Sequence, residues 1–220
     1  MKVVLAGGHG KIALLLQEQL AQAGHRSVGI IRKQDQAADL ERVGSTALVL
    51  DLEHSEAATL APHLADADAV VFAAGGGPNS GAARKLTVDR DAAVLLADAA
   101  ELAGVRRYLM VSALATDDFD PDQADVETGD VFQVYLRAKS EADADLRGRD
   151  LDWTVVRPGG LTDDPPTGRV LVAPSTGRGT VPRADVAAVL LTLLETGAAV
   201  QAQFELVSGD VPIELALASL

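Results

Sequence analysis

The chain has 220 residues, of which 48% are hydrophobic and 23% are charged, and its formal net charge is −13. This length suffices for one well-buried domain, the composition excludes general disorder, and the acidic balance argues against a nucleic-acid partner. The absence of cysteine excludes disulfides, thiolate metal sites and cysteine nucleophiles. No apolar run approaches the ~20 residues of a membrane span, and the opening MKVVLA is short for a secretory signal. We therefore expect a cytoplasmic protein without a membrane partner.

Apolar segments alternate with helical segments along most of the chain. Buried strands are expected at residues 2–7, 25–32, 45–52, 68–75, 105–113 and 151–159. Helices are expected between them, at residues 12–24, 37–44, 56–66, 86–104 and 132–150. Strands that are apolar throughout and separated by helices indicate a parallel sheet covered on both faces. The expected class is therefore α/β, the doubly wound (Rossmann) fold, with its ligand crevice at the carboxyl ends of the strands.

The remaining segments fit into the same body. Residues 178–209 add one helix and one strand, and neither a repeat nor a linker divides the chain, so residues 1–220 are expected to form one domain. Residues 116–130 carry seven Asp or Glu and no Lys or Arg, which is typical of a solvated surface loop or of a mobile flap.

A glycine-rich turn follows the first strand. Gly7, Gly10 and Ala13 have the spacing G-x-x-G-x-x-A between a strand and a helix, which predicts a dinucleotide diphosphate at the start of the helix. A tight turn without a ligand is the alternative, and His9 either hydrogen-bonds a phosphate or is exposed. The residues predicted to bind at this turn are Gly7, Gly8, His9, Gly10, Lys11 and Ile12.

The ends of the next three strands carry further candidates. Arg32 and Lys33 end the second strand, where a guanidinium favours the 2′-phosphate of NADP; Asp35 close by keeps NAD as the alternative, and ordinary exposed cations are another. After the third strand, an adenine amino group would donate to Asp51 and the ring would pack on Leu52. Small residues after the fourth strand would let the dinucleotide pass close to the backbone, namely Ala73, Ala74 and Gly75.

Candidates for chemistry follow the fifth strand. Ser112 ends that strand, and Tyr135 and Lys139 are four residues apart on one face of a predicted helix. A phenol with a pKa near ~10 needs help to transfer protons at neutral pH, and a neighbouring ammonium would lower that pKa. The alternative is a half-buried tyrosine beside a surface lysine.

These motifs resemble the short-chain dehydrogenase/reductase superfamily, and more closely its atypical NAD(P)-binding branch with NmrA-like and epimerase-like members. The segments that carry the resemblance are GGHGKIA, VDRDAAVLLADAAELAGVRRYLMVSA, YLRAKSEADADLRGRDLDWTVVRPGGLTDDPPTG and GTVPRADVAAVLL. The resemblance implies that Ser112, Tyr135 and Lys139 are catalytic and that Lys139 also holds the nicotinamide ribose. It further implies cofactor contacts from Val111, Ser112, Lys139, Pro158, Gly159 and Gly160. Asp89 and Arg90 lie where classical members often have an asparagine, a departure from the pattern.

Three functions are compatible with these residues. The first is an NADPH-dependent oxidoreductase that transfers a hydride to a small carbonyl substrate, with Tyr135 as proton donor. The second is an NAD(P)-sensing regulatory protein without turnover, and the third is an enzyme like a nucleotide-sugar epimerase or dehydratase. The short chain after residue 165 leaves a small C-terminal substrate region, and we expect a monomer or homodimer. Metal is not expected, because the four histidines lack close pairing. Arg157 and Asp185 are expected to pair structurally.

Overall fold

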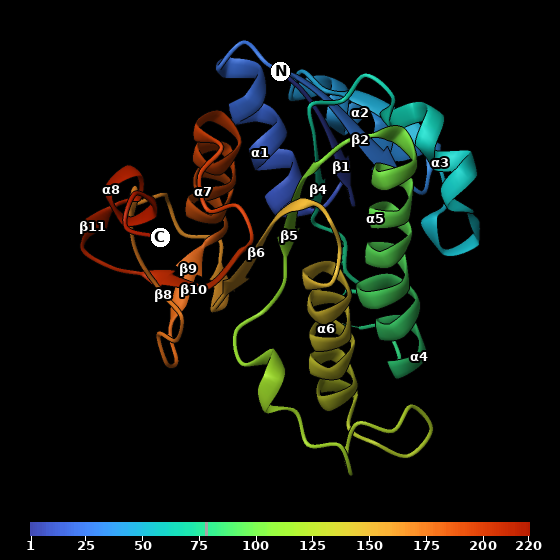
Figure 1. Ribbon diagram of the computed structural model, residues 1–220, viewed down its shortest axis with the longest axis vertical. Coiled ribbons are helices and arrows are strands. Elements are labelled where there is room, and N and C mark those ends of the chain that lie inside the picture. The colour runs from blue at the N-terminus through green and yellow to red at the C-terminus, as the bar shows by residue number, and fades with distance from the viewer. Residues whose placement is uncertain (78) are drawn as a thin grey trace.

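The computed structural model describes residues 1–77 and 79–220 and has α/β architecture (Figure 1). Nine strands form one sheet, and two short strands form a second. The strands are β1 (Lys2–Ala6), β2 (Arg26–Ile31), β3 (Thr46–Val49), β4 (Ala69–Phe72), β5 (Arg107–Val111), β6 (Asp152–Pro158), β7 (Gly160–Thr162), β8 (Arg169–Ala173), β9 (Thr180–Pro182), β10 (Ala202–Ser208) and β11 (Val211–Pro212). The α-helices are α1 (Lys11–Gln22), α2 (Ala37–Arg42), α3 (Ala57–Leu64), α4 (Ala82–Arg84), α5 (Ala92–Ala103), α6 (Val131–Arg147), α7 (Arg183–Thr196) and α8 (Ile213–Leu217).

The large sheet has the order β11-β8-β10-β6-β5-β4-β1-β2-β3. β1 to β6 and β10 are parallel, whereas β8 is antiparallel to both of its neighbours. The chain passes outward from β1 to β3 and then returns to β4 on the other side of β1. This reversal places the switch point of the sheet between β1 and β4, where a doubly wound fold has its ligand crevice.

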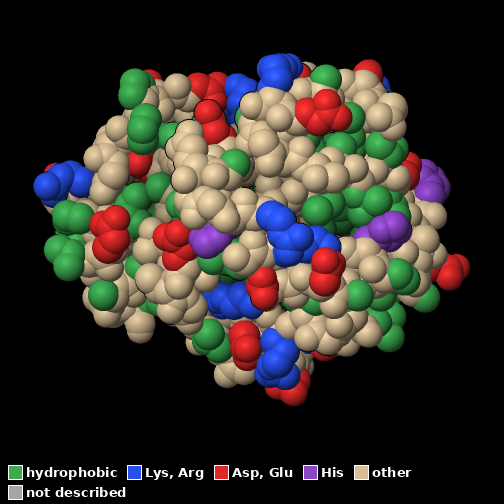
Figure 2. Space-filling model, turned by 90° about the horizontal axis from the view of Figure 1, so that it is seen from above, with side chains coloured by type: hydrophobic (Ala, Val, Ile, Leu, Met, Phe, Trp, Pro, Cys, Tyr) green, Lys and Arg blue, Asp and Glu red, His purple; other side chains and the backbone are tan. Residues whose placement is uncertain are grey.

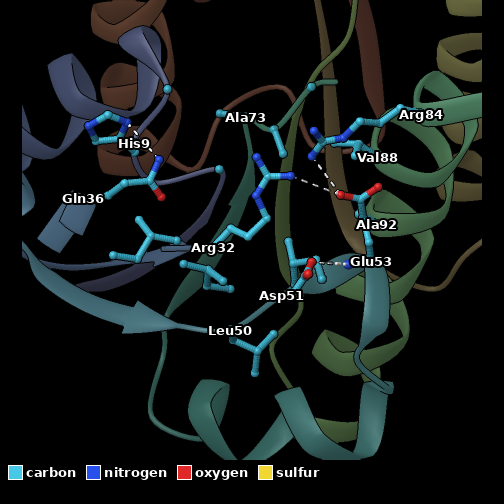
Figure 3. Close-up of a pocket in the computed structure, with 17 residues that line it drawn as sticks. His9, Arg32, Gln36, Leu50, Asp51, Glu53, Ala73, Arg84, Val88 and Ala92 are labelled. Carbon is cyan, nitrogen blue, oxygen red and sulfur yellow. Dashed lines mark hydrogen bonds and ion pairs between the residues drawn. The ribbon is translucent and has the colours of Figure 1, made fainter. Parts of the chain in front are cut away.

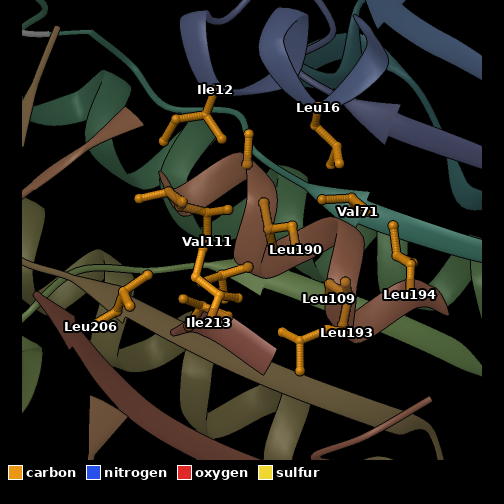
Figure 4. Packing of buried hydrophobic residues seen from close by; sticks show 14 of the residues in the cluster. Ile12, Leu16, Val71, Leu109, Val111, Leu190, Leu193, Leu194, Leu206 and Ile213 are labelled. Atoms are coloured by element: carbon orange, nitrogen blue, oxygen red, sulfur yellow. The ribbon is translucent and has the colours of Figure 1, made fainter. Parts of the chain in front are cut away.

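Helices cover both faces of the sheet, and each strand supplies alternate side chains to the two faces (Figure 1). In β1, Val3 and Leu5 belong to one buried cluster, and Val4 and Ala6 belong to another. The first cluster lies against α1 and α7 (Figure 4), and the second lies against α3, α5 and α6. Most side chains in both layers are aliphatic, as expected for a chain with only 3% aromatic residues, and the aromatic exceptions are Phe204 in the first cluster and Phe72, Tyr108 and Trp153 in the second.

Two parts of the structure differ from the expectations of the sequence. The helix expected at 86–104 is composite: a π-helix, η3 (Lys85–Asp91), leads directly into α5. The C-terminal third also contains more elements than expected. The sequence predicted α7 and β10, and the structure adds the strands β7, β8, β9 and β11 and the helix α8. These strands are short, and β8 pairs with β10 and β11 in an antiparallel sense that no local pattern predicts.

The acidic segment 116–130 is fastened to the body at several points. The side chain of Gln133 accepts from the amide of Asp120 at 2.8 Å, and Arg137 donates to the carbonyl of Ala124 at 3.2 Å. Asp130 ends the segment as the N-cap of α6, where its carboxylate accepts from the amides of Phe132 and Gln133. The segment is therefore a loop with specific anchors.

Charges of both signs are interspersed on the surface. Figure 2 shows basic side chains near the middle of one face, flanked by acidic ones. At the amino ends of β5 and β6, for example, Arg106 pairs with Asp150 at 3.1 Å and with Asp152 at 3.2 Å. Such exposed pairs contribute little to stability, because water and salt screen the charges.

Candidate active site

The glycine turn joins the end of β1 to the start of α1 and leaves backbone groups facing a cavity. Gly7 has a φ of +77°, and a Cβ at this position would lie 2.6 Å from the Cα of Ala74 in the loop after β4. Gly10 is the N-cap of α1, and neither a side-chain cap nor an acidic residue occupies the first turn. The amides of that turn and the positive end of the helix dipole are therefore available to an anion, as a diphosphate requires.

Gly8 has a packing role in the same turn. Its amide donates to the carbonyl of Ile30 at 2.8 Å, and a Cβ would lie 2.6 Å from the Cα of Gly29 in β2. Gln17 also donates to the carbonyl of Gly8 at 2.7 Å. Gly8 thus holds the turn against β2 and does not line a cavity.

A first cavity of about 250 Å³ opens beside the turn (Figure 3). It is bounded by the ends of β1 to β4, as the sequence predicts for the adenosine side of a dinucleotide. Of the predicted residues, its walls contain Gly7, His9, Gly10, Arg32, Asp51, Leu52, Ala73, Ala74 and Gly75.

Two guanidinium groups meet at the first cavity. Arg32, from the end of β2, lies 3.5 Å from the carboxylate of Glu53, and Arg84, from α4, donates to the same carboxylate at 2.8 Å. Figure 3 shows both arginines directed towards Glu53 across the cavity. One carboxylate is thus shared by two cations, and a second carboxylate, that of Asp51, lines the same cavity. Neither Arg84 nor Glu53 was predicted from the sequence.

His9 and Asp51 line the first cavity with their polar atoms already engaged. The ring of His9 is 36% exposed and contacts Asp39 at 2.6 Å and Gln36 at 3.2 Å (Figure 3). Asp51 accepts from the amide of Glu53 and pairs with His54, both at 3.0 Å. Burial raises the pKa of Asp51, but hydrogen bonds from His54 and Glu53 outweigh it, so the pKa lies below its ordinary value. Asp51 is therefore an ionised acceptor.

Several predicted residues lie outside both cavities of the described residues. Lys33 is exposed at the start of the 3₁₀-helix η1 (Gln34–Gln36), and Lys11 pairs with Asp163 at 2.5 Å. Pro158 ends β6, while Gly159 packs so closely on the carbonyl of Gly179 that a Cβ would lie 2.4 Å from that oxygen. The predicted residues outside the cavities are Gly8, Lys11, Lys33, Pro158, Gly159 and Gly160.

A second cavity, of about 750 Å³, adjoins the first at Ala73, Ala74 and Gly75. It receives side chains from elements that are far apart in the sequence, including α1, η3, β5, α6, β7 and α7. Of the predicted residues, it contains Ile12, Ala73, Ala74, Gly75, Val111, Ser112, Tyr135 and Lys139. The residues singled out for chemistry are thus brought to one place.

Tyr135 and Lys139 project from one face of α6, as their spacing predicts. Lys139 is buried, donates to the carbonyl of Val111 at 3.2 Å and lies 3.4 Å from the carboxylate of Asp89 in η3. Asp89 is buried as well and accepts from the amide of Gly76 at 2.9 Å. Asp89 therefore fixes both the lysine and the loop after β4.

Burial controls the protonation of this pair. Burial raises the pKa of Tyr135, and the opposing effect of Lys139 is too small to reverse it, so the phenol keeps its proton at neutral pH. Burial alone would lower the pKa of Lys139, but Asp89 and then Tyr135 and Asp143 raise it above its ordinary value. The site thus holds a neutral phenol beside a charged ammonium.

Ser112 faces the second cavity, but its hydroxyl donates a hydrogen bond to a residue behind the cavity wall. Its hydroxyl donates to Asp143 at 2.9 Å, and Asp143 lies one turn beyond Lys139 on α6. A hydroxyl has one proton and two lone pairs, so Ser112 presents an acceptor to the cavity.

A buried network fixes Asp143. Arg157, from β6, donates to Asp143 at 2.8 and 2.9 Å and to Asp117 at 2.7 and 3.1 Å. Asp117 belongs to the 3₁₀-helix η4 (Thr116–Asp118), so the network connects the sheet to the acidic segment. The expected pair of Arg157 and Asp185 is wrong: Asp185 accepts instead from the amides of Thr167 and Gly168.

Sequence reasoning missed several residues of the second cavity. Lys85, Phe132 and Arg183 line it, and Asp89 was noted only as a departure. Lys85 and Arg183 look like ordinary surface cations in helical patterns. Phe132, one residue into α6, carries the only local signal: a large apolar side chain at the exposed start of a helix.

The described residues contain neither a metal-binding cluster nor a helix that could cross a membrane. Within residues 1–77 and 79–220, no group of three or more His, Asp or Glu side chains is arranged to hold a metal ion. Across the same residues, none of the helices has both the length and the apolar character needed to span a bilayer.

The fold and the two adjoining cavities define an NAD(P)H-binding protein, and comparison with known proteins gives the same result. The model of the NAD(P)H-binding family matches residues 7–197, so the chain belongs to this family. The predicted resemblance to the atypical short-chain dehydrogenase/reductase branch is confirmed.

The relatives match over the whole chain. The uncharacterized sugar epimerase YhfK of Bacillus subtilis is 35% identical over 221 residues, covering 100% of both chains. A solved structure from Bacillus halodurans, named as a candidate NAD-dependent epimerase/dehydratase, has a TM-score of 0.89 and 35% identity, again over 100% of both chains. The oxidoreductase ylbE of Lactococcus lactis has a TM-score of 0.84 and 26% identity, covering 100% of this chain and 96% of that one.

Proposed function

We propose that the protein is an NADPH-dependent reductase of small carbonyl compounds. The observation that carries this proposal is the neutral phenol of Tyr135 at the wall of the second cavity, beside Lys139 and next to the dinucleotide side of the crevice. The phenol holds a proton that a carbonyl oxygen could take, and the ammonium of Lys139 would stabilise the phenolate left behind, which is the pairing that reduction of a carbonyl requires. A relative of similar fold is named as an oxidoreductase.

The residues present fit a dinucleotide. The glycine-rich turn with its uncapped helix start would hold the diphosphate, and the three small residues after β4 leave space for the connecting ribose. Arg32 and Arg84 share one carboxylate, and the Nε atom of Arg84 is buried without a hydrogen-bond partner among the described residues, so a 2′-phosphate would offer acceptors to these guanidinium groups. This supports NADP over NAD.

The chain's own residues would handle the proton. The turn after β1 and the ends of β2 to β4 would hold a reduced nicotinamide cofactor, which would supply the hydride for the carbonyl carbon. Tyr135 gives its proton to the carbonyl oxygen, and solvent restores that proton. Lys139 stabilises the transient phenolate. The Ser112 hydroxyl, which donates its hydrogen bond to Asp143, would accept a hydrogen bond from the alcohol that forms.

The test is NADPH oxidation over a panel of aldehydes and ketones, with Tyr135→Phe as the variant. We expect the wild-type protein to reduce members of the panel and the variant to lose about 10²- to 10⁴-fold in kcat, the usual contribution of a general acid. Calorimetric titration of the variant with NADPH should give unchanged affinity. Unchanged turnover in the variant would exclude Tyr135 as the acid.

A second candidate function comes from the relatives named as epimerases. An epimerase or dehydratase keeps its nucleotide through the cycle, so oxidised cofactor would remain with the protein during purification. Absorbance and mass spectrometry of the denatured protein distinguish the two: tightly retained NAD⁺ or NADP⁺ supports the epimerase, and a freely exchanging nucleotide supports the reductase.

A further inference from the structure

We propose that the substrate of the second cavity is an anion: an aldehyde or ketone with an apolar or aromatic body and a carboxylate, which Lys85 binds. This inference rests on the proposed reductase function and names its substrate class. It comes from the charge and shape of the cavity wall.

Lys85 is a buried cation that faces the cavity. The residue is 7% exposed, and it begins the π-helix η3. Its ammonium donates to the carbonyl of Gly77 at 2.6 Å and lies 5.4 Å from the centre of the Tyr135 ring. Among the residues that the structure describes, no carboxylate lies within 4 Å of this ammonium, whereas Lys139 has Asp89 at 3.4 Å. An ammonium has three protons, so Lys85 can still donate to a ligand.

The other charges of the cavity are already matched. Asp89 pairs with Lys139, and Asp130 accepts from two amides at the start of α6. Arg183 pairs with Asp163 at 2.7 Å, and that carboxylate also serves Lys11. The wall therefore has an excess of positive charge in a chain whose net charge is −13. A buried cation without a counter-ion is costly, and a carboxylate on the ligand would compensate it.

The remaining wall is apolar. Phe132 lies at the exposed start of α6 with 60% of its surface accessible, and its ring centre is 6.0 Å from that of Tyr135. This apolar surface suits a hydrocarbon or aromatic body, and the volume of about 750 Å³ accommodates more than a single ring. The apolar residues are Ile12, Val111, Val131, Phe132 and Leu161.

The position of Lys85 separates it from the predicted cofactor phosphates. Lys85 lines the second cavity and not the first, whereas Gly7, Gly10 and Arg32 line the first and not the second. The ammonium is also close to the phenol that we propose as the acid. A carboxylate held by Lys85 would therefore bring the substrate towards Tyr135.

The experiment compares two substrates that differ in one charge, 4-formylbenzoate and its methyl ester, in NADPH oxidation by the wild-type protein and by Lys85→Met. We expect kcat/KM to be higher for the carboxylate, and the ratio of the two values to fall at least about tenfold in Lys85→Met, as loss of a charge-assisted hydrogen bond predicts. Lys2→Met is the matched control, because it removes the same charge at the opposite end of β1 and should leave the ratio unchanged.

A binding measurement separates this inference from the proposed function. Calorimetry with benzoate, on the protein saturated with NADP⁺, should give an affinity that falls at least about tenfold in Lys85→Met. If benzoate binds through Lys85 but neither aldehyde is reduced, the reductase proposal fails and the anion site stands. An equal loss of kcat/KM on 4-formylbenzoate and on its methyl ester would instead mean that Lys85 supports proton transfer by Tyr135, and it would overturn the anion site. Weaker NADPH binding in Lys85→Met, with no change in the ratio, would overturn it too.

Discussion

The two cavities that meet at Ala73, Ala74 and Gly75 are built in different ways. The first takes its residues mainly from consecutive strand ends, and its turn is shaped by backbone that side chains would obstruct. The second takes its residues from elements up to about 170 residues apart, as Ile12 and Arg183 show, and its buried charged side chains are Lys85, Asp89 and Lys139. The first cavity therefore depends on local sequence and sterics, and the second depends on long-range packing of charged groups.

The largest expected effect concerns the buried network behind the second cavity. Arg157→Met leaves Asp143 fully buried without its cation, and we expect the free energy of unfolding to fall by about 3–5 kcal/mol. Denaturant titration measures this. The double variant Arg157→Met/Asp143→Leu should recover most of the loss, because it removes the unpaired charge. A loss below about 1 kcal/mol in the single variant would show that the network does not support this half of the molecule.

The next effect tests the steric character of the first cavity. Gly7→Ala forces a Cβ to 2.6 Å from Ala74 at a φ of +77°, so the turn must shift, and we expect NADPH affinity to fall about 100-fold or more. Gly24→Ala is the matched control, since Gly24 has a φ of +78° but nothing within 4 Å of an added Cβ. It should lose about 1 kcal/mol of stability and keep its affinity. Equal affinity in both variants would contradict the assignment of the turn.

Much of the first half of the molecule could be predicted from sequence because its signals are local. The strand, the glycine spacing and the start of α1 are adjacent in the chain, and they led to the fold class and the family that the comparisons confirm. Arg32 was predicted from its place after β2. Arg84, which shares Glu53 with Arg32, comes from helix α4, and no spacing rule connects the two arginines.

A third prediction sharpens the choice between NADP and NAD. Arg32→Asp should lower NADPH affinity at least about tenfold more than NADH affinity, because an acidic side chain repels the 2′-phosphate and accepts from a 2′-hydroxyl. Fluorescence titration with both nucleotides gives the ratio. Lys33→Asp makes the same charge change at the neighbouring exposed position and should alter the ratio much less. An equal loss of affinity for NADPH and NADH in Arg32→Asp would contradict the assignment of Arg32 to the 2′-phosphate.

The second half of the molecule could be predicted only in part. The spacing of Tyr135 and Lys139 placed both on one helix face, and the structure brings them into one cavity with Ser112. The residue to which the Ser112 hydroxyl donates is Asp143, which is held in place by Arg157, and these three residues meet only through tertiary packing. Burial also raises the pKa of Tyr135, whereas the sequence indicated only the lowering by Lys139.

The smallest expected effect is a pH dependence at the edge of this half. Hydrogen bonds from Arg157 outweigh the raising effect of burial and hold the pKa of Asp117 below its ordinary value of 3.8. The stabilisation by this pair is therefore complete above pH 3.8 and is lost as the pH falls through the lower pKa of the folded state. Because the Asp117 side chain is 53% exposed, we expect at most about 1 kcal/mol. Asp117→Asn should flatten the stability curve of the folded protein between about pH 4 and pH 2 by that amount, and an identical curve would contradict the role of the pair.

The π-helix at Lys85–Asp91 gives the substrate side of the molecule an unusual sensitivity to chain length. The i→i+5 hydrogen bonds of a π-helix enclose one residue more than the i→i+4 bonds of an α-helix, so the segment holds one residue that a regular helix between the same ends would not need. Deleting a single residue between Lys85 and Asp89 would let the segment close into a regular α-helix, and the ammonium of Lys85 would then move relative to the carboxylate of Asp89, which holds Lys139. For the anion site proposed at Lys85, a one-codon deletion here would therefore be a short route to a different ligand preference.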